Sequence, residues 1–177
     1  LIRAEEQGAK LTEDELVTTA ILILNAGHEA TVHAIGNGIK CLLEQGIRTG
    51  IDEACVEETL RYDAPLHLFT RYALEDLDYA GIRLKKGETV GLMLGAANRD
   101  PARFPEPDRF IPGRDPNPQV SFGAGIHFCI GAPLARLEMQ IAMPLLFQRL
   151  PRLALAEQPT YRNAYHFHGL ESLKVTF

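Results

Sequence analysis

The residues of this chain that are best placed to do chemistry surround a single cysteine. Cys129 lies in the glycine-rich run SFGAGIHFCIG, residues 121–131, with His127 two positions before it. Residues 132–138 then resemble a helix start, so we expect a buried thiolate, stabilised by backbone amides and by the positive end of a helix dipole. A thiolate in that setting suits an axial ligand of haem iron. The alternative is a structural cysteine buried in a loop-to-helix turn.

The run around Cys129 resembles the haem-binding loop of the cytochrome P-450 monooxygenases, F-x-x-G-x-[RH]-x-C-x-G. Every fixed position of that pattern is filled, and a pattern with so many fixed positions is far more specific than a lone glycine motif. The resemblance implies that Cys129 is the metal ligand of a haem b group. The other cofactor-binding residues that it implies in this loop are Phe122, Gly123, His127 and Gly131, and Gly125 fills the remaining fixed position.

A second motif, AGHEAT, begins at Ala26 and is similar to the family's oxygen-activation motif, A-G-x-[DE]-T. The resemblance implies that a flat haem lies against the small residues Ala26 and Gly27, and that Glu29 relays protons. It breaks at Ala30, where the family usually has threonine. Thr31 is turned about 100° further round the helix. Glu29 and Thr31 are therefore the catalytic candidates, with a substrate hydroxyl or an ordered water expected to replace the missing threonine.

Glu58 and Arg61 form an E-x-x-R pair at helical spacing. On its own this pair is weak evidence of function, because such pairs usually lie on solvated helix surfaces. The sequence PDRF, which contains Arg109, looks like a second family motif in a proline-rich segment. Together the two motifs imply a buried structural network of Glu58, Arg61 and Arg109 that supports the cysteine loop.

Arg71 and His127 match the residues that bind haem propionates in the family. Taken alone, Arg71 would be an exposed strand residue and His127 would cap a turn. His166 and His168 alternate as metal ligands can, but with no third ligand nearby, strand residues on one face are the better interpretation. The substrate-contact candidates are Leu22, Asn25, Leu66, His67, Leu68, Tyr165 and His166.

Composition limits the class of protein. The chain has 177 residues, 46% of them hydrophobic, and a net charge of -5, which argues against nucleic-acid binding. Residues 18–39 are apolar on nearly all sides and predict a helix that crosses a protein interior. His28 and His33 within this stretch argue against a membrane span. Scattered cysteines at positions 41, 55 and 129, with no leader segment recognised, favour a soluble cytoplasmic protein.

The expected fold class is mixed α and β, mostly α-helical, as in the C-terminal portion of the cytochrome P-450 fold. Thr12 and Glu15 form a capping box before a helix that reaches about Glu44. Asp52 caps a helix that ends near Tyr62. The rest is expected to comprise short strands over 66–90, a helical turn at 96–98, an irregular segment with six prolines over 101–118, a helix over 132–148, and strands and loops over 150–177.

The leading hypothesis is a haem-thiolate monooxygenase that inserts one oxygen atom of O2 into an organic substrate, with electrons from a ferredoxin or flavodoxin and its reductase. Ala30 favours one alternative, a peroxide-driven or isomerase-type enzyme of the same kind. Another is a haem-free inactive fragment. The chain begins with Leu1, and the resemblance covers the C-terminal half of the family's usual length. We therefore expect residues 1–177 to be a single-domain fragment that is inactive and holds haem poorly in isolation.

Overall fold

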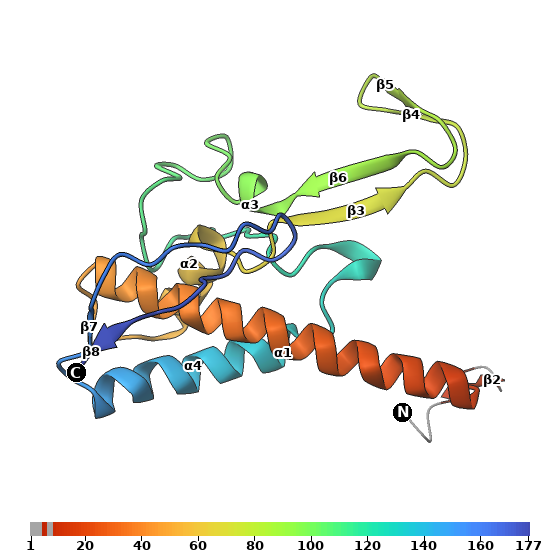
Figure 1. Ribbon diagram of the computed structural model, residues 1–177. Helices are drawn as coiled ribbons and strands as arrows, with labels where there is room; N and C mark the ends of the chain where they lie inside the picture. The colour runs from red at the N-terminus through yellow and green to blue at the C-terminus, as the bar shows by residue number, and fades with distance from the viewer. Residues whose placement is uncertain (1–4, 7–8) are drawn as a thin grey trace.

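The structure is a computed structural model that describes residues 5–6 and 9–177 (Figure 1). Its helices are α1 (Glu13–Glu44), α2 (Glu53–Tyr62), α3 (Leu94–Ala97) and α4 (Ala132–Arg149), with a 3-10 turn at Gly125–His127. Its strands are β1 (Glu5–Glu6), β2 (Ala9–Lys10), β3 (Leu68–Tyr72), β4 (Leu77–Tyr79), β5 (Ile82–Leu84), β6 (Thr89–Met93), β7 (Ala154–Leu155) and β8 (Val175–Thr176). This mixed fold, with more helix than strand, confirms the expected fold class.

The helix starts follow from local sequence signals. The Thr12 hydroxyl accepts a hydrogen bond from the Glu15 amide at 3.3 Å, and the Glu15 carboxylate accepts from the Thr12 amide at 2.8 Å. This capping box satisfies two donors at the start of α1. The Asp52 carboxylate accepts from the Cys55 amide at 3.2 Å at the start of α2. Pro133 lies in the first turn of α4, where its missing N–H leaves nothing unpaired.

Helices α1, α2 and α4 pack against one another around the hydrophobic core. Figure 1 shows α4 beginning beside the middle of α1 and running in the same direction along its C-terminal half. Gly38 lies at this contact, where a β-carbon would be only 2.9 Å from Cε of Met143. The fully buried apolar side chains come from all three helices and include Leu42, Val56, Leu60, Met139 and Met143.

Helix α1 is buried only in its C-terminal part, from His33 onward. Leu22 and Leu24 are 65% and 71% exposed, whereas Leu42 is 0% exposed. The expectation that the whole apolar stretch crosses a protein interior therefore holds for residues 33–39 and not for residues 18–32, where the described residues leave the side chains largely uncovered. None of the described helices combines the length and the apolar composition that crossing a membrane requires.

The strands form small antiparallel pairs rather than one large sheet. In the longest pair, β3 and β6, Leu68 lies opposite Met93 and Tyr72 lies opposite Thr89. Strands β4 and β5 form a hairpin that projects from the helices (Figure 1). Residues 101–118 run through turns and bends without helix or strand, as their prolines predict. This irregular segment joins α3 to the cysteine loop and begins beside α2.

Candidate functional site

A buried ion pair lies on α2. Glu58 and Arg61 are one helical turn apart, and both side chains have a relative exposure of 0%. Nε and Nη2 of Arg61 donate to Oε2 and Oε1 of Glu58, both at 2.8 Å. Paired donors of this kind make a strong, geometrically specific contact. The E-x-x-R pair is therefore present and lies in the interior of the described structure, not on its solvated surface.

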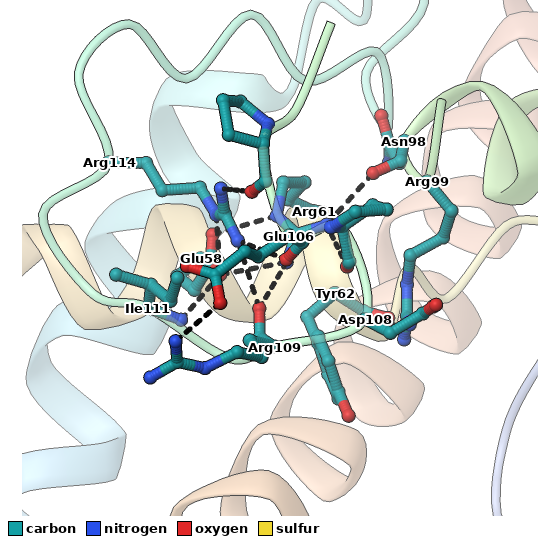
Figure 2. Close-up of polar contacts among 12 residues, drawn as sticks. Glu58, Arg61, Tyr62, Asn98, Arg99, Glu106, Asp108, Arg109, Ile111 and Arg114 are labelled. Carbon is teal, nitrogen blue, oxygen red and sulfur yellow. Dashed lines mark hydrogen bonds and ion pairs between the residues drawn. The ribbon is translucent and has the colours of Figure 1, made fainter. Parts of the chain in front are cut away.

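All five N–H donors of Arg61 have acceptors. Beyond Glu58, Nη1 donates to the carbonyls of Asn98 and Pro107, and Nη2 donates to the carbonyl of Arg109, each at 2.9 Å (Figure 2). A buried charged donor without a partner is strongly unfavourable. The backbone between residues 98 and 109 is therefore held around the guanidinium group of Arg61.

The side chain of Arg109 does not take part as the sequence predicted. Its side chain is 68% exposed and its Nη1 binds Oε1 of Glu106 at 2.5 Å, so Arg109 contributes only its backbone carbonyl to the network. Arg114 supplies the second guanidinium, with Nε 3.1 Å from Oε1 of Glu58 and a side chain only 7% exposed. Glu106 lies three residues before Arg109, and its carboxylate accepts a hydrogen bond from the exposed Arg109 side chain. The chain beyond residue 109 brings the Arg114 side chain back to Glu58 (Figure 2).

Asn98 connects this network to the cysteine loop. Its side-chain amide donates to Oγ of Ser121 at 2.7 Å, and its Oδ1 accepts from the Val120 amide at 2.8 Å. Ser121 in turn donates to the Leu60 carbonyl at 2.6 Å. Because the Asn98 carbonyl also accepts from Arg61, one fully buried residue ties the ion pair to the start of the loop.

A second charged contact fixes α4 to α2. The Arg136 guanidinium binds the Glu57 carboxylate at 2.5 and 3.1 Å, and its Cζ lies 4.5 Å from the centroid of the Phe122 ring. Sequence reasoning missed Asn98, Arg114 and Arg136 as supports of the loop. The only signal for Arg136 was its place near the start of the helix that follows the cysteine. Nothing in the local sequence singled out Asn98.

The cysteine loop folds back on itself directly before α4. The Cys129 amide donates to the Phe122 carbonyl at 2.9 Å, and the Ala132 amide donates to the Cys129 carbonyl at 3.2 Å. Gly123 and Gly125 have φ angles of 71° and 64°, a left-handed conformation that favours glycine. The loop glycines thus allow the reversal that brings the cysteine to the first turn of α4, whose N-cap is Gly131.

The thiol of Cys129 is exposed in this structure, so the expectation of a buried thiolate is wrong for the described residues. Its neighbours are apolar and are also open to solvent: Ile126 is 98% exposed, Phe128 50% and Ile130 95%. Cys129 and these apolar neighbours in the chain are therefore exposed together, so a soft ligand belongs to an exposed apolar part of the surface.

A haem group fits the residues of this surface. Thiolate sulfur is a ligand that haem iron accepts, and exposed apolar side chains suit contact with a macrocycle. On α1, a β-carbon added at Gly27 would have no atom within 4 Å, so there is room for a planar group against that part of the helix. Arg71 is half-buried on β3 and His127 is exposed in the 3-10 turn; both side chains are of the type that binds carboxylates.

The catalytic candidates lie on the middle of α1. The Glu29 side chain is 47% exposed, and its Oε1 lies 3.6 Å from Nε2 of His33 and 3.7 Å from Nη1 of Arg162. Ala26 and Gly27 are exposed, and Thr31 is half-buried. The acid thus has basic neighbours from its own helix and from the C-terminal segment.

Some of the substrate-contact candidates come together and others do not. Leu66 pairs with Phe167 in an isolated bridge, and the His67 amide donates to the His166 carbonyl at 3.1 Å. The His166 ring lies 5.4 Å from the Phe69 ring, at the start of β3 beside Leu68. Leu22, Asn25 and Tyr165 are exposed. No group of metal-ligating side chains, at His166 and His168 or elsewhere, was found among the described residues.

Comparison with known proteins identifies the family. The family profile "Cytochrome P450" matches residues 52–163, which include the ion pair, the proline-rich segment and the cysteine loop. The chain belongs to the cytochrome P450 family. It is 47% identical to the biotin biosynthesis cytochrome P450 of Bacillus subtilis (strain 168), over 100% of this chain and 47% of that protein.

Other cytochromes P450 match over the same extent. The vitamin D(3) 25-hydroxylase of Pseudonocardia autotrophica is 43% identical over 98% of this chain and 46% of its own length. The crystal structure of P450BioI in complex with an acyl carrier protein ligated to hexadec-9Z-enoic acid superposes with a TM-score of 0.90 at 48% identity, covering 95% of this chain and 46% of that one. The chain spans about half the length of the curated relatives it matches.

Replacing Arg114 should destabilise the protein much more than replacing Arg109. Arg114→Ala leaves the buried Glu58 carboxylate with one charged partner fewer, so we expect a loss of about 3 kcal/mol in the free energy of unfolding. Arg109→Ala removes only an exposed pair and should cost less than about 1 kcal/mol. Urea unfolding of both variants measures the difference. Equal losses would contradict the assignment of Arg114 to the network.

His67 should make the stability of the protein depend on pH. Burial, followed by the charge of His168, lowers the pKa of His67 to about 4 from an ordinary value of 6.5. Between these values the unfolded chain takes up a proton that the folded chain does not, so the free energy of unfolding should fall as the pH falls from 6.5 to 4.

The matched variants for this effect are His67→Gln and His28→Gln, the latter an exposed histidine of α1. Urea unfolding across this pH window should give a shallower slope for His67→Gln and an unchanged slope for His28→Gln. Parallel slopes for the wild type and His67→Gln would show that His67 does not cause the dependence.

Proposed function

We propose that this chain is the haem-binding part of a haem-thiolate monooxygenase that inserts one oxygen atom of O2 into an organic substrate. The observation that carries the proposal is the position of Cys129. Its thiol lies at the start of α4 among exposed apolar side chains, on a loop that the buried Glu58–Arg61 network supports. Membership of the cytochrome P450 family adds a second, independent reason.

Each candidate residue has a proposed role. Cys129 binds the iron of haem b, and Arg71 and His127 bind its carboxylates. The bound haem supplies the chemistry of oxygen activation, which thiolate ligation favours. Glu29 moves protons at its carboxylate, with Arg162 and His33 as the basic groups nearest to it. The remaining proposed haem contacts are Ala26, Gly27, Phe122, Gly123 and Gly131, and Thr31 assists Glu29.

Residues 1–177 are proposed to act as one structural unit of a longer cytochrome P450 chain, because the relatives match over about half of their length. The exposed apolar faces of α1 and α4, at Leu24 and Leu137 for example, are consistent with further contacts in such a chain. Electrons are proposed to come from a ferredoxin or flavodoxin with a reductase. The cytoplasm is the proposed location, in keeping with cysteines that are all unpaired among the described residues.

The substrate is proposed only as an organic molecule. One of the two named relatives acts, by its name, in biotin biosynthesis, and the other hydroxylates vitamin D(3). The acyl carrier protein in the P450BioI structure belongs to that complex. Relatives at similar identity with such different names favour no single substrate for this chain.

Ala30 favours a second candidate, a peroxide-driven or isomerase-type enzyme that keeps the same iron ligand. Alanine at this position of α1 has no hydroxyl to offer, and Thr31 lies on a different side of the helix. If proton delivery is impaired for this reason, Ala30→Thr should lower the peroxide released per NADPH consumed by about twofold or more. The measurement uses full-length protein with a reductase system. Unchanged peroxide release would show that Ala30 does not limit coupling.

The iron ligand is tested by Cys129→Ser in the full-length protein. The reduced carbonyl complex of the wild type should have the long-wavelength Soret band that thiolate ligation produces, and Cys129→Ser should lose it. Cys55→Ser, which removes another free thiol, should keep it. A long-wavelength band that survives in Cys129→Ser would overturn the proposal. A pyridine haemochromogen assay on the 177-residue chain separately tests whether this part retains haem alone, and a haem-free chain would fit the inactive-fragment alternative.

A further inference from the structure

A second buried cluster lies at the end of α2, around a cavity that Arg61 of the Glu58 network also lines. The Asp63 side chain is 7% exposed. Its Oδ2 accepts a hydrogen bond from the Tyr161 hydroxyl at 2.5 Å and one from the Cys41 thiol at 3.6 Å, and its Oδ1 lies 3.1 Å from Nε2 of His168. Although burial alone would raise the pKa of Asp63, the bonds from His168 and Tyr161 lower it below its ordinary value, so the carboxylate remains charged.

Three rings stack beside this carboxylate. The His168 ring lies 3.8 Å from the His67 ring at 12° and 4.0 Å from the Tyr161 ring at 17°. The imidazole of His168 is therefore held between two flat neighbours while it contacts Asp63. We call Asp63, His67, Tyr161 and His168 the Asp63 cluster.

The Asp63 cluster holds two points of one irregular segment. Residues 161–170, which we call the C-terminal strap, have only isolated β-bridges and no helix or continuous strand pair. Tyr161 and His168 both bind the carboxylate of Asp63, so the six residues between them form a loop closed at its base. Tyr165, at the middle of this loop, is 80% exposed. The base of the loop is also held by the Arg162 amide, which donates to the Gly169 carbonyl at 2.9 Å, and by the Asn37 side-chain amide, which donates to the His168 carbonyl at 2.9 Å. Without a regular ladder, the position of the loop depends on this small set of single contacts, to which the Asp63 bonds belong.

The C-terminal strap contacts residues on both sides of the candidate site, at the start of β3 and on α1. On the β3 side, the His168 amide donates to the Pro65 carbonyl at 2.8 Å, and the His166 ring packs against Phe69. On the α1 side, Arg162 lies 3.7 Å from Glu29. A β-carbon at Gly169 would lie only 1.9 Å from Nδ1 of His33, so the strap presses closely on the helix.

We propose that the Asp63 cluster is a set of positioning residues that fixes the C-terminal strap and thereby the space available to a substrate between the strap and α1. The inference rests on the proposed function, because it takes Glu29 and His166 to face the substrate. Tyr161 and His168 act through the strap without touching the substrate. Loss of one anchor lets the loop at residues 162–167 move while the Glu58 network and the cysteine loop stay in place.

Tyr161→Phe in the full-length protein is the sharpest test, because it removes the hydroxyl bound to Asp63 and keeps the stacked ring. Tyr79→Phe is the matched control, with the same change on an exposed tyrosine of β4, outside the strap and the candidate site. The first readout is amide hydrogen exchange of peptides that cover residues 161–170. The second compares binding of imidazole and of the larger 4-phenylimidazole to the haem iron.

We expect Tyr161→Phe to speed exchange in the strap and to change the dissociation constant of 4-phenylimidazole by about threefold or more, with imidazole unchanged. Tyr79→Phe should leave both exchange in the strap and the ratio of the two dissociation constants as in the wild type. A general effect on the iron would change the dissociation constants of imidazole and 4-phenylimidazole by the same factor, and this result would overturn the proposal. So would a lower melting temperature of Tyr161→Phe with wild-type exchange and a wild-type ratio.

The two proposals fail in different ways. If the full-length protein lacks a thiolate-type carbonyl spectrum, the proposed function is wrong, and the exchange measurement still decides whether the Asp63 cluster holds the strap. If the spectrum is present and strap exchange does not differ between Tyr161→Phe and Tyr79→Phe, only the positioning role is wrong.

Discussion

The buried pair of Glu58 and Arg61 is the interaction on which the rest of the site depends. Two charges with no exposed side-chain surface are stable only when every donor and acceptor is satisfied. Arg61 achieves this with carbonyls from the segment that follows α3, and Glu58 with the Ile111 amide and Arg114. The irregular segment has no helix or strand, and its internal bonds are turns together with those that the Arg114 side chain donates to its carbonyls. The ion pair therefore acts as the template around which this segment takes one conformation.

Hydrogen bonds and an ion pair connect this network to the cysteine loop. Asn98 binds both Arg61 and the first residues of the loop, and Arg136 fixes α4 to α2 beneath Phe122. The sulfur of Cys129 is placed by groups several residues away from it, while its own surroundings remain open and apolar. The Asp63 cluster is arranged in a similar way, because a buried carboxylate binds the C-terminal strap while outer side chains of the strap remain exposed.

The sequence predicted those features of the fold that depend on local signals, namely the helix starts and the cysteine loop. The capping box at Thr12, the cap at Asp52 and Pro133 at the start of α4 set the helix boundaries, and the cysteine motif marked the loop. It did not predict that Arg114 would replace Arg109 beside Glu58, because that contact joins residues 56 positions apart through a segment without periodicity. Among the described residues, Cys129 and the first half of α1 are more exposed than their apolar sequence surroundings suggest. Burial depends on which surfaces meet, and hydrophobicity along the chain does not specify the partner.

The central claim is that this buried scaffold presents the Cys129 sulfur to iron. X-ray absorption at the iron edge of the haem-loaded full-length protein tests it most directly, because it reports the atoms bound to the metal. The account predicts one sulfur neighbour in the wild type and in Arg109→Ala, and a reduced sulfur contribution in Arg114→Ala. Iron bound only by nitrogen and oxygen in the wild type would contradict the account.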